Sequence, residues 1–252
     1  MSRLVWDRSG EREYETGIDH GVLFVYHKAS GSTPAGYGAG VEWNGLTGVS
    51  ESPSGAEPTA LWADNIKYLN LMSAEEFGGT ITCYMYPDEW KYCDGEKNLI
   101  YSASGTDTEM PGVSIGQQSR STFALSYRTL IGNDTESNDH GYKLHLVYGC
   151  LASPSQKDYK TVNDNPEGLE FSFEFKTTPV EVPGFKPTAT VTIDSTCYQN
   201  SDTTAADAKI KLTRLEDFIY GTDANGNDAA TTSALPMPAD IPAIMNGTYV
   251  AG

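Results

Sequence analysis

The residues that could support catalysis are thinly spread along the chain. Two histidines directly follow an aspartate, in the pairs Asp19-His20 and Asp139-His140, but neighbouring side chains point to opposite sides of an extended strand and form no proton relay. His145 lies on the polar side of an alternating stretch, where a solvated or interfacial histidine is expected. Motifs for a nucleophilic serine, a zinc-protease helix or a nucleotide-binding loop are missing from the sequence. We therefore expect no enzyme and no cofactor.

Two acid-rich turns, at 132–141 and 221–228, raise the question of a metal site. Neither has the ligand spacing of an EF-hand loop, and Asp and Asn are common in turns because their side chains bond to their own backbone. Ordinary turns are expected there, with a cation site as the alternative. The four cysteines form no CxxC pair and lie in or beside apolar stretches: Cys83, Cys93, Cys150 and Cys197. This pattern favours buried reduced thiols over a disulfide or metal framework.

The chain is acidic along its whole length. Its 252 residues include 34 Asp and Glu against 17 Lys and Arg, a net charge of −17, with no basic block. Binding to phosphates or to anionic membranes requires clustered Lys and Arg, so both kinds of partner are disfavoured. No apolar run approaches the ~20 residues that cross a bilayer, and the charged N-terminus lacks the apolar core of a signal peptide. These features predict a soluble protein that is made in the cytoplasm.

Most of the patterned sequence alternates with period two, as half-buried β-strands do. The predicted strands are 21–27, 66–72, 80–86, 121–130, 142–151, 169–179 and 188–194. Helix is scarce. One short turn is expected in each of 73–79 and 87–95, and 206–221 fits a longer helix or, through Ile210 and Leu212, a strand.

Three regions lack such patterning. The stretch 29–60 is rich in Gly, Ser and Pro and reads as a long loop, 221–252 reads as a pliable extension, and 1–17 as an arm. The expected fold is mainly β, a sandwich or barrel with one or two short helices. It comprises a domain over 1–194, with the arm and the long loop, and a C-terminal strand or helix with an extension over 195–252.

One predicted strand shows the alternation most clearly. Its apolar side is formed by Leu169, Phe171, Phe173 and Phe175, and its polar side by Glu170, Ser172, Glu174 and Lys176. The apolar side predicts core. The acidic side faces water, a seam between proteins or a channel.

Several long blocks resemble one protein family. They cover 6–26, 41–95, 115–134, 141–149 and 152–180, and they are similar to the major tail protein, or tail tube protein, of bacteriophages with long tails. The resemblance implies a β-sandwich with a short helix. It also implies that six copies form a ring and that rings stack into a hollow tube through which the genome passes.

The resemblance further implies the partners and the location. The partners would be other copies of the chain, the tape measure protein, the tail terminator and distal tail proteins, and double-stranded DNA that passes without specific binding. The protein would be made in the host cytoplasm and located in the virion, with no membrane partner. An acidic channel suits passing DNA, because repeated phosphate contacts would otherwise hold it.

The residues expected to serve these roles come from two stretches. Glu170, Glu174 and Lys176 are candidates for the channel surface, with a salt bridge between subunits or the outer surface as alternatives. Trp43, Asn44, Glu51 and Glu57, in the long loop, are candidates for contacts between rings, together with the N-terminal arm. An ordinary solvent-exposed loop is the alternative there.

A second class of function is a free-standing β-sandwich that binds carbohydrate or a cell surface. The 15 tyrosines and 4 tryptophans are compatible with it, although most lie within strands or turns. The two hypotheses differ on assembly. A tube protein forms rings or tubes when concentrated, whereas a binding module stays monomeric.

Overall fold

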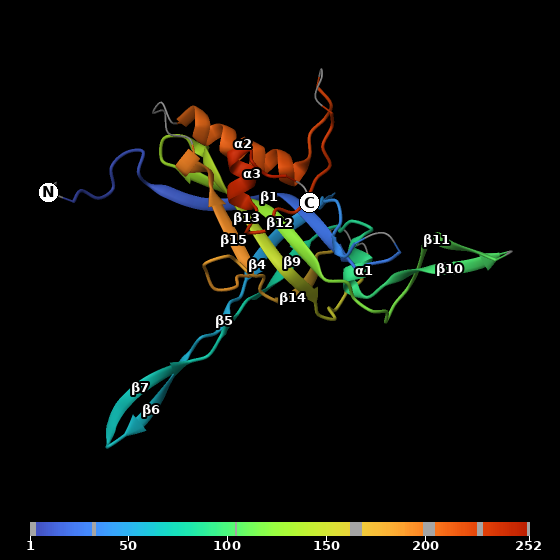
Figure 1. The fold of residues 1–252 in the computed structure, drawn as a ribbon, viewed down its shortest axis with the longest axis horizontal. Coiled ribbons are helices and arrows are strands. Elements are labelled where there is room, and N and C mark those ends of the chain that lie inside the picture. The colour runs from blue at the N-terminus through green and yellow to red at the C-terminus, as the bar shows by residue number, and fades with distance from the viewer. Residues whose placement is uncertain are drawn as a thin grey trace.

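A computed structural model describes residues 4–31, 34–103, 105–161, 168–198, 205–225 and 229–250 of the chain (Figure 1). The fold is mainly β, as the alternating sequence predicts. A large antiparallel sheet forms the body, and the two C-terminal α-helices pack against one of its faces. Two narrow ribbons leave the body in different directions (Figure 1).

The body is a nine-stranded antiparallel sheet. Along the sheet the strands are β2 (Gly36–Tyr37), β1 (Glu13–His27), β12 (Phe123–Asn133), β13 (Ser137–Ala152), β14 (Phe171–Thr177), β9 (Gly78–Cys83) and β4 (Leu46–Glu51). Beside this path, β3 (Val41–Glu42) pairs with β1, and β15 (Thr190–Asp194) pairs with β13. All seven predicted strands are present, six of them in this sheet.

The sheet curls so that its last strand, β4, comes back against β1. The two strands contact each other, although they lie at opposite parts of the sheet order. The hydroxyl of Tyr127 on β12 donates a 2.6 Å hydrogen bond to Glu51 on β4. Between β3 and β4, the backbone N–H of Trp43 donates to the carbonyl of Gly21 on β1 at 2.8 Å. The body is therefore a partly closed barrel.

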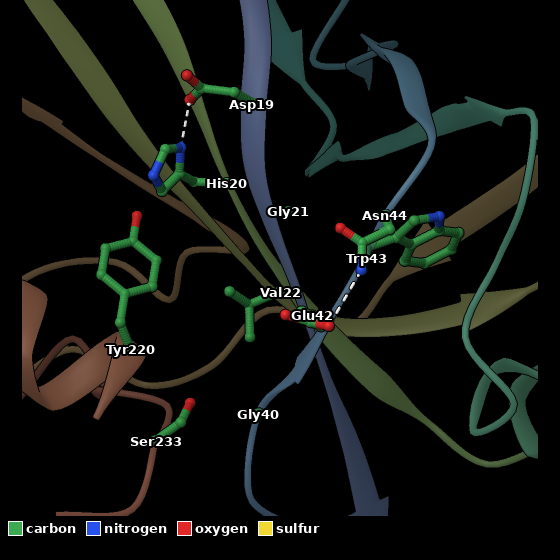
Figure 2. Close-up of a pocket in the computed structure, with 10 residues that line it drawn as sticks. All are labelled: Asp19, His20, Gly21, Val22, Gly40, Glu42, Trp43, Asn44, Tyr220 and Ser233. Atoms are coloured by element: carbon green, nitrogen blue, oxygen red, sulfur yellow. Dashed lines mark hydrogen bonds and ion pairs between the residues drawn. The ribbon is translucent and has the colours of Figure 1, made fainter. Parts of the chain in front are cut away.

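β1 is irregular in its middle. Its pairing with β12 shifts on either side of Asp19, and His20 has a left-handed backbone with φ +50°. The two side chains therefore turn toward each other, with 3.0 Å between Asp19 Oδ1 and His20 Nδ1 (Figure 2). The expectation that these neighbours point apart is wrong, because it assumed a regular strand. In the second pair, Asp139-His140, the Nδ1 of His140 lies 2.6 Å from the carboxylate of Glu136.

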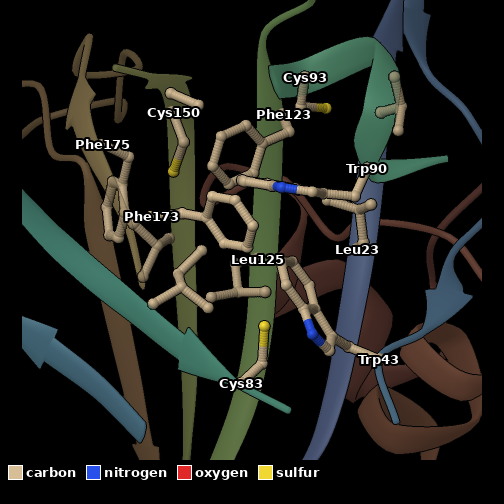
Figure 3. Close-up of a cluster of buried hydrophobic side chains, with 14 of the residues drawn as sticks. Leu23, Trp43, Cys83, Trp90, Cys93, Phe123, Leu125, Cys150, Phe173 and Phe175 are labelled. Carbon is tan, nitrogen blue, oxygen red and sulfur yellow. The ribbon is translucent and has the colours of Figure 1, made fainter. Parts of the chain in front are cut away.

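The inner core lies inside the curl and is rich in aromatic side chains (Figure 3). Trp90 is fully buried, and its ring centre lies 4.9 Å from that of Phe123 and 5.0 Å from that of Phe173. Trp90 begins α1 (Trp90–Asp94), and Gly95 ends this helix with φ +85°. The short helix predicted within 87–95 is confirmed. Full burial of one such side chain contributes about 1.5–3 kcal/mol to the free energy of unfolding.

The predicted state of the cysteines is confirmed for three of the four. Cys83, Cys93 and Cys150 are buried free thiols in the inner core, whereas the free thiol of Cys197 is exposed. Burial raises the pKa of Cys83 to about 11 and that of Cys93 to about 12. Both groups are therefore protonated and unreactive at neutral pH.

The outer core lies on the opposite face of the same strands. It is covered by α2 (Ala205–Tyr220) and α3 (Ile241–Asn246), with the short 3-10 helix η1 (Ser195–Tyr198) beside them. Leu212, Leu215 and Ile219 recur on one side of α2 and are buried against Leu144 and Leu146 of β13. β1, β12 and β13 are thus buried on both faces. This explains why 22–26 is apolar without a break.

Two ribbons project beyond this body (Figure 1). The long ribbon, residues 54–76, contains β5 (Ser54–Gly55), β6 (Pro58–Ala63), β7 (Ile66–Met72) and β8 (Glu75–Glu76). The short ribbon, residues 97–115, contains β10 (Lys97–Ala103) and β11 (Thr106–Ile115). Each consists of two strands or strand pairs in antiparallel register.

Three expectations for the irregular regions need correction. The stretch 29–60 contains β2, β3 and β4, which pair with strands of the body, and β5 and the start of β6, which pair with β8 and β7. The stretch 73–79 forms no helical turn but contains β8 and the start of β9, since pairing overrides its local preference. The described part of 221–252 includes α3 and buries Leu235, so it is a packed segment. For 206–221, the helix alternative is confirmed.

Residues on both sides of position 194 share the outer core, so the C-terminal part packs on the same sheet as the rest. Among the described residues, no helix combines the length and the apolar character that crossing a bilayer would require.

Candidate assembly surfaces

The long ribbon exposes most of its apolar side chains to solvent. Trp62 is 69 % exposed, Tyr68 68 %, Met72 66 % and Ile66 63 %. Single exposed apolar residues are ordinary on a protein surface, but a contiguous exposed group marks a contact site. Here the group occupies a segment whose residues belong to neither core.

Both faces of the long ribbon are apolar. Successive side chains of a strand point to opposite faces, so Tyr68 and Met72 of β7 lie on one face and Leu69 and Leu71 on the other. The register places Leu61 opposite Leu69 and adds a second apolar contact to that face. The ribbon thus has no polar side to present to water. A two-stranded ribbon of this kind is marginally stable alone and needs a surface to pack on.

The tip of the long ribbon is a tight turn. Asp64 and Asn65 have φ of +50° and +63°, which is the type I′ geometry that suits the twist of a two-residue hairpin. Asp and Asn tolerate this conformation better than other residues with side chains. The turn at the tip of the ribbon is therefore encoded locally.

The root of the long ribbon is fastened to the body. Glu51, at the end of β4, accepts the hydrogen bond from Tyr127 described above, and the backbone N–H of Ser52 donates to the carbonyl of Gly78 at 2.8 Å. Burial, and then the hydrogen bond to Glu51, raise the pKa of Tyr127, which keeps its hydroxyl protonated as a donor. The ribbon is therefore a projection with a fixed base.

The short ribbon is a second exposed apolar projection. Ile100 is 58 % exposed and Tyr101 60 %, and Leu99, Met110 and Val113 are each 40 % exposed. No strand was predicted from the sequence within 97–115. The alternation of Leu99 and Tyr101 before Gly105 was the signal that could have identified the first strand of this ribbon. The signal was weak because the two strands contain few aromatic residues, and their register shifts near Ile100.

The N-terminal segment, residues 4–12, is a third projection. Leu4 is 73 % exposed and Trp6 75 % exposed. Its base is held at Gly10, whose N–H donates a 2.8 Å hydrogen bond to Asp134 Oδ1 and whose carbonyl accepts a 3.3 Å hydrogen bond from Asn133 Nδ2. The predicted arm is therefore free of the body as far as this anchor, and from Glu13 onward it is part of β1.

The sheet also presents strand edges that other copies could pair with. β4 ends the main strand order, and the side of β15 away from β13 has no partner strand among the described residues. Unpaired N–H and C=O groups along an edge can join another chain. Together with the three projections, these edges are the candidate assembly surfaces.

The residues predicted to contact a neighbouring ring are found in different environments. Asn44, Glu51 and Glu57 are exposed, and Asn44 Nδ2 donates a 3.1 Å hydrogen bond to Glu42. Trp43 is only 3 % exposed, belongs to the inner core and donates from its indole to the carbonyl of Met85. Its ring is therefore not available for a contact with another copy.

The residues predicted to face a channel share one exposed surface. Glu174 and Lys176 lie on the outer side of β14, opposite the buried Phe173 and Phe175, so the predicted alternation is confirmed. Glu170 precedes the strand and accepts a 2.7 Å hydrogen bond from the hydroxyl of Thr47.

The two acid-rich turns of the sequence raised the question of a metal site. No cluster of three or more His, Cys, Asp or Glu side chains in metal-binding geometry occurs within the described part of the chain. The acidic turn at 221–228 lies partly outside the described residues. In the turn at 132–141, Asn133 Oδ1 accepts hydrogen bonds from the backbone N–H groups of Thr135 and Glu136, as turn residues commonly do.

Comparison of the sequence with models of protein families, and with curated proteins, gave no match.

Proposed function

We propose that this protein is the structural subunit of a tube, built from rings of identical copies that stack on one another, as in the tails of long-tailed bacteriophages. The observation that carries the proposal is the long ribbon, which is apolar on both faces and exposed along its length. A single copy leaves this surface in water. Burial against further copies removes it from water at about 25 cal/mol per Å² of apolar area.

The strand edges supply the other contact that a ring needs. An edge on one side of a subunit that pairs with a different edge of the next makes a head-to-tail contact, which closes into a ring when the rotation permits. Stacking of rings is open-ended and requires contacts in a second direction. The two ribbons and the N-terminal segment project from the body in different directions (Figure 1), and in this proposal they make those contacts. The number of six copies in a ring rests on the family resemblance.

The charge of the chain suits a channel for DNA. With a net charge of −17 for each copy, a ring repels phosphates more than it binds them. DNA could then pass many rings without being held. In this proposal the tape measure protein lies inside the tube, and the terminator and distal tail proteins contact its ends. The protein itself is part of the virion.

A polar variant of the long ribbon tests the proposal. Replacement of Trp62, Tyr68 and Leu71 with serine should leave the body folded, because none of these side chains contributes to either core. Each loss should weaken assembly by about 1–2 kcal/mol per contact, or about tenfold, so the triple variant should remain monomeric. Sedimentation velocity over a concentration series measures this, and circular dichroism checks the fold.

The matched control changes exposed apolar residues outside the projections. Phe185 is 81 % exposed and Val250 85 % exposed, and Phe185→Ser with Val250→Ser should assemble like the unmodified chain. Assembly of the triple serine variant at the same concentration as the control would refute the role of the ribbon.

A binding module remains the second candidate, because Trp62 and Tyr68 are exposed aromatic residues of the kind that stack on sugars. A binding module would remain monomeric at high concentration. It would bind a glycan, and Trp62→Ala would abolish that binding. The same sedimentation series separates the two functions.

A further inference from the structure

A pocket of about 670 Å³ opens beside the irregular middle of β1 (Figure 2). We call it the β1 pocket. It lies between β1, β3 and the end of α2, and the side chains that matter below are Asp19, His20, Val22, Glu42, Asn44 and Tyr220. The left-handed backbone at His20 creates one wall, because it turns two polar side chains out of the regular strand. Backbone strain of this kind concentrates at functional sites.

The two carboxylates of the β1 pocket differ in availability. Asp19 accepts hydrogen bonds of 2.7 Å and 2.8 Å from Arg128, and this pairing lowers the pKa of Asp19. Its charge is therefore already balanced. Glu42 is exposed, and within the described residues the hydrogen bond from Asn44 is the one its carboxylate accepts. The β1 pocket can thus take one additional cation, at Glu42.

The same pocket offers a donor and an apolar surface. The hydroxyl of Tyr220 is buried and has no hydrogen-bond partner among the described residues. Burial raises its pKa to about 12, so it remains protonated and can donate to a carbonyl of a bound chain. The apolar lining of the pocket comes from the ring of Tyr220 and the backbone of Gly21 and Gly40, together with the small exposed part of Val22. A suitable ligand therefore carries an apolar group, a backbone carbonyl and a cation.

The N-terminal segment has this combination. Trp6 is exposed, and two residues later the guanidinium of Arg8 is half exposed and lies 3.6 Å from Glu11. The segment is a single chain there.

The segment of the same copy is directed elsewhere. The anchor at Gly10 ties it to the turn between β12 and β13, and from there it runs away from the body (Figure 1). An occupant with the same sequence must therefore come from another copy.

We propose that the β1 pocket receives the N-terminal segment of a second copy, with Trp6 against its apolar surface and Arg8 on Glu42. This contact rests on the proposed function and adds to it the site at which one projection is held. The bound segment gives up its freedom, and the charge-assisted hydrogen bond and the buried indole offset that loss.

A labelled peptide of residues 4–12 tests this pairing with the full chain at a concentration below that of assembly. Fluorescence anisotropy should show saturable binding. Glu42→Gln in the protein or Arg8→Gln in the peptide should each weaken binding about tenfold. The two changes combined should weaken it no further than either alone, because both remove the same ion pair. Glu181→Gln, an exposed acid in the connection between β14 and β15 and outside the three projections, is the matched control and should bind the peptide normally.

Absence of binding at millimolar peptide, or equal binding to the unmodified chain and to Glu42→Gln, would overturn the pairing. Additive effects of the two changes would also overturn it, because they would place Arg8 and Glu42 in separate contacts. Failure of the peptide to bind can be distinguished from failure of the chain to form tubes. Sedimentation of the full chain reports assembly whether or not the peptide binds.

Discussion

His145 illustrates how a single residue is constrained by the curl of the sheet. Its ring stacks on Tyr127 with 4.7 Å between ring centres and 7° between planes. Its Nε2 lies 2.9 Å from the hydroxyl of Thr129, which donates its own proton to Glu15 at 2.6 Å. Nε2 must therefore be the protonated nitrogen. Nδ1 is buried without a hydrogen-bond partner among the described residues, 3.8 Å from Glu51.

This environment predicts a pH dependence of stability. Burial lowers the pKa of His145 below 6.5, so the unfolded chain binds the proton more readily than the folded one, and stability is lost as the pH falls below about 6.5. His145→Gln should reduce the loss between pH 7 and pH 5. Urea unfolding at a series of pH values measures the difference from the unmodified chain.

His140 provides a control of opposite sign. Its hydrogen bond to Glu136 raises the pKa of His140, so it stabilises the fold at low pH and this contribution is lost as the pH rises through the raised value. His140→Gln should therefore make the chain relatively less stable at pH 5 than at pH 8. An unchanged pH profile for both variants would contradict the assignment of these environments.

At the scale of elements, the long ribbon should be separable from the body. Replacement of 54–76 with a two-residue turn removes no core residue, because the strands on either side, β4 and β9, already pair with each other. The shortened chain should unfold at nearly the same temperature as the full chain and should not form tubes. Differential scanning calorimetry and light scattering measure the two properties.

The deletion must be limited to the ribbon and must leave residues 29–53 in place. Deletion of that entire stretch would remove Trp43 from the inner core and β4 from the sheet. Loss of a buried tryptophan alone costs about 3–5 kcal/mol, so a failure to assemble would then report misfolding. A large fall in the unfolding temperature of the 54–76 variant would contradict the independence of the ribbon.

The strands of the body could be predicted from the sequence because they alternate or are continuously apolar. The strand predicted at 66–72 has the same bounds as β7. Its sequence pattern did not indicate that both of its faces would be exposed. Alternation reports which side chains share a face, not what covers that face. The β1 pocket escaped prediction for a related reason, since it depends on the irregular pairing near Asp19, which no local pattern marks.

At the scale of the whole molecule, the body and its projections have different requirements. Two cores bury both faces of β1, β12 and β13, so the body is complete as a single chain. The long ribbon, the short ribbon and the N-terminal segment keep large apolar side chains in water. A chain that carries a net charge of −17 and exposes this much apolar surface is suited to ordered assembly, since like charges disfavour unspecific association.

Electron microscopy of the purified chain at high concentration tests the central claim most directly. The account predicts rings with a central hole, stacked into tubes, in which the ribbons of one ring lie on the next. Uniform particles with the mass of a single chain would contradict it, if they persist at high concentration while the protein remains in solution.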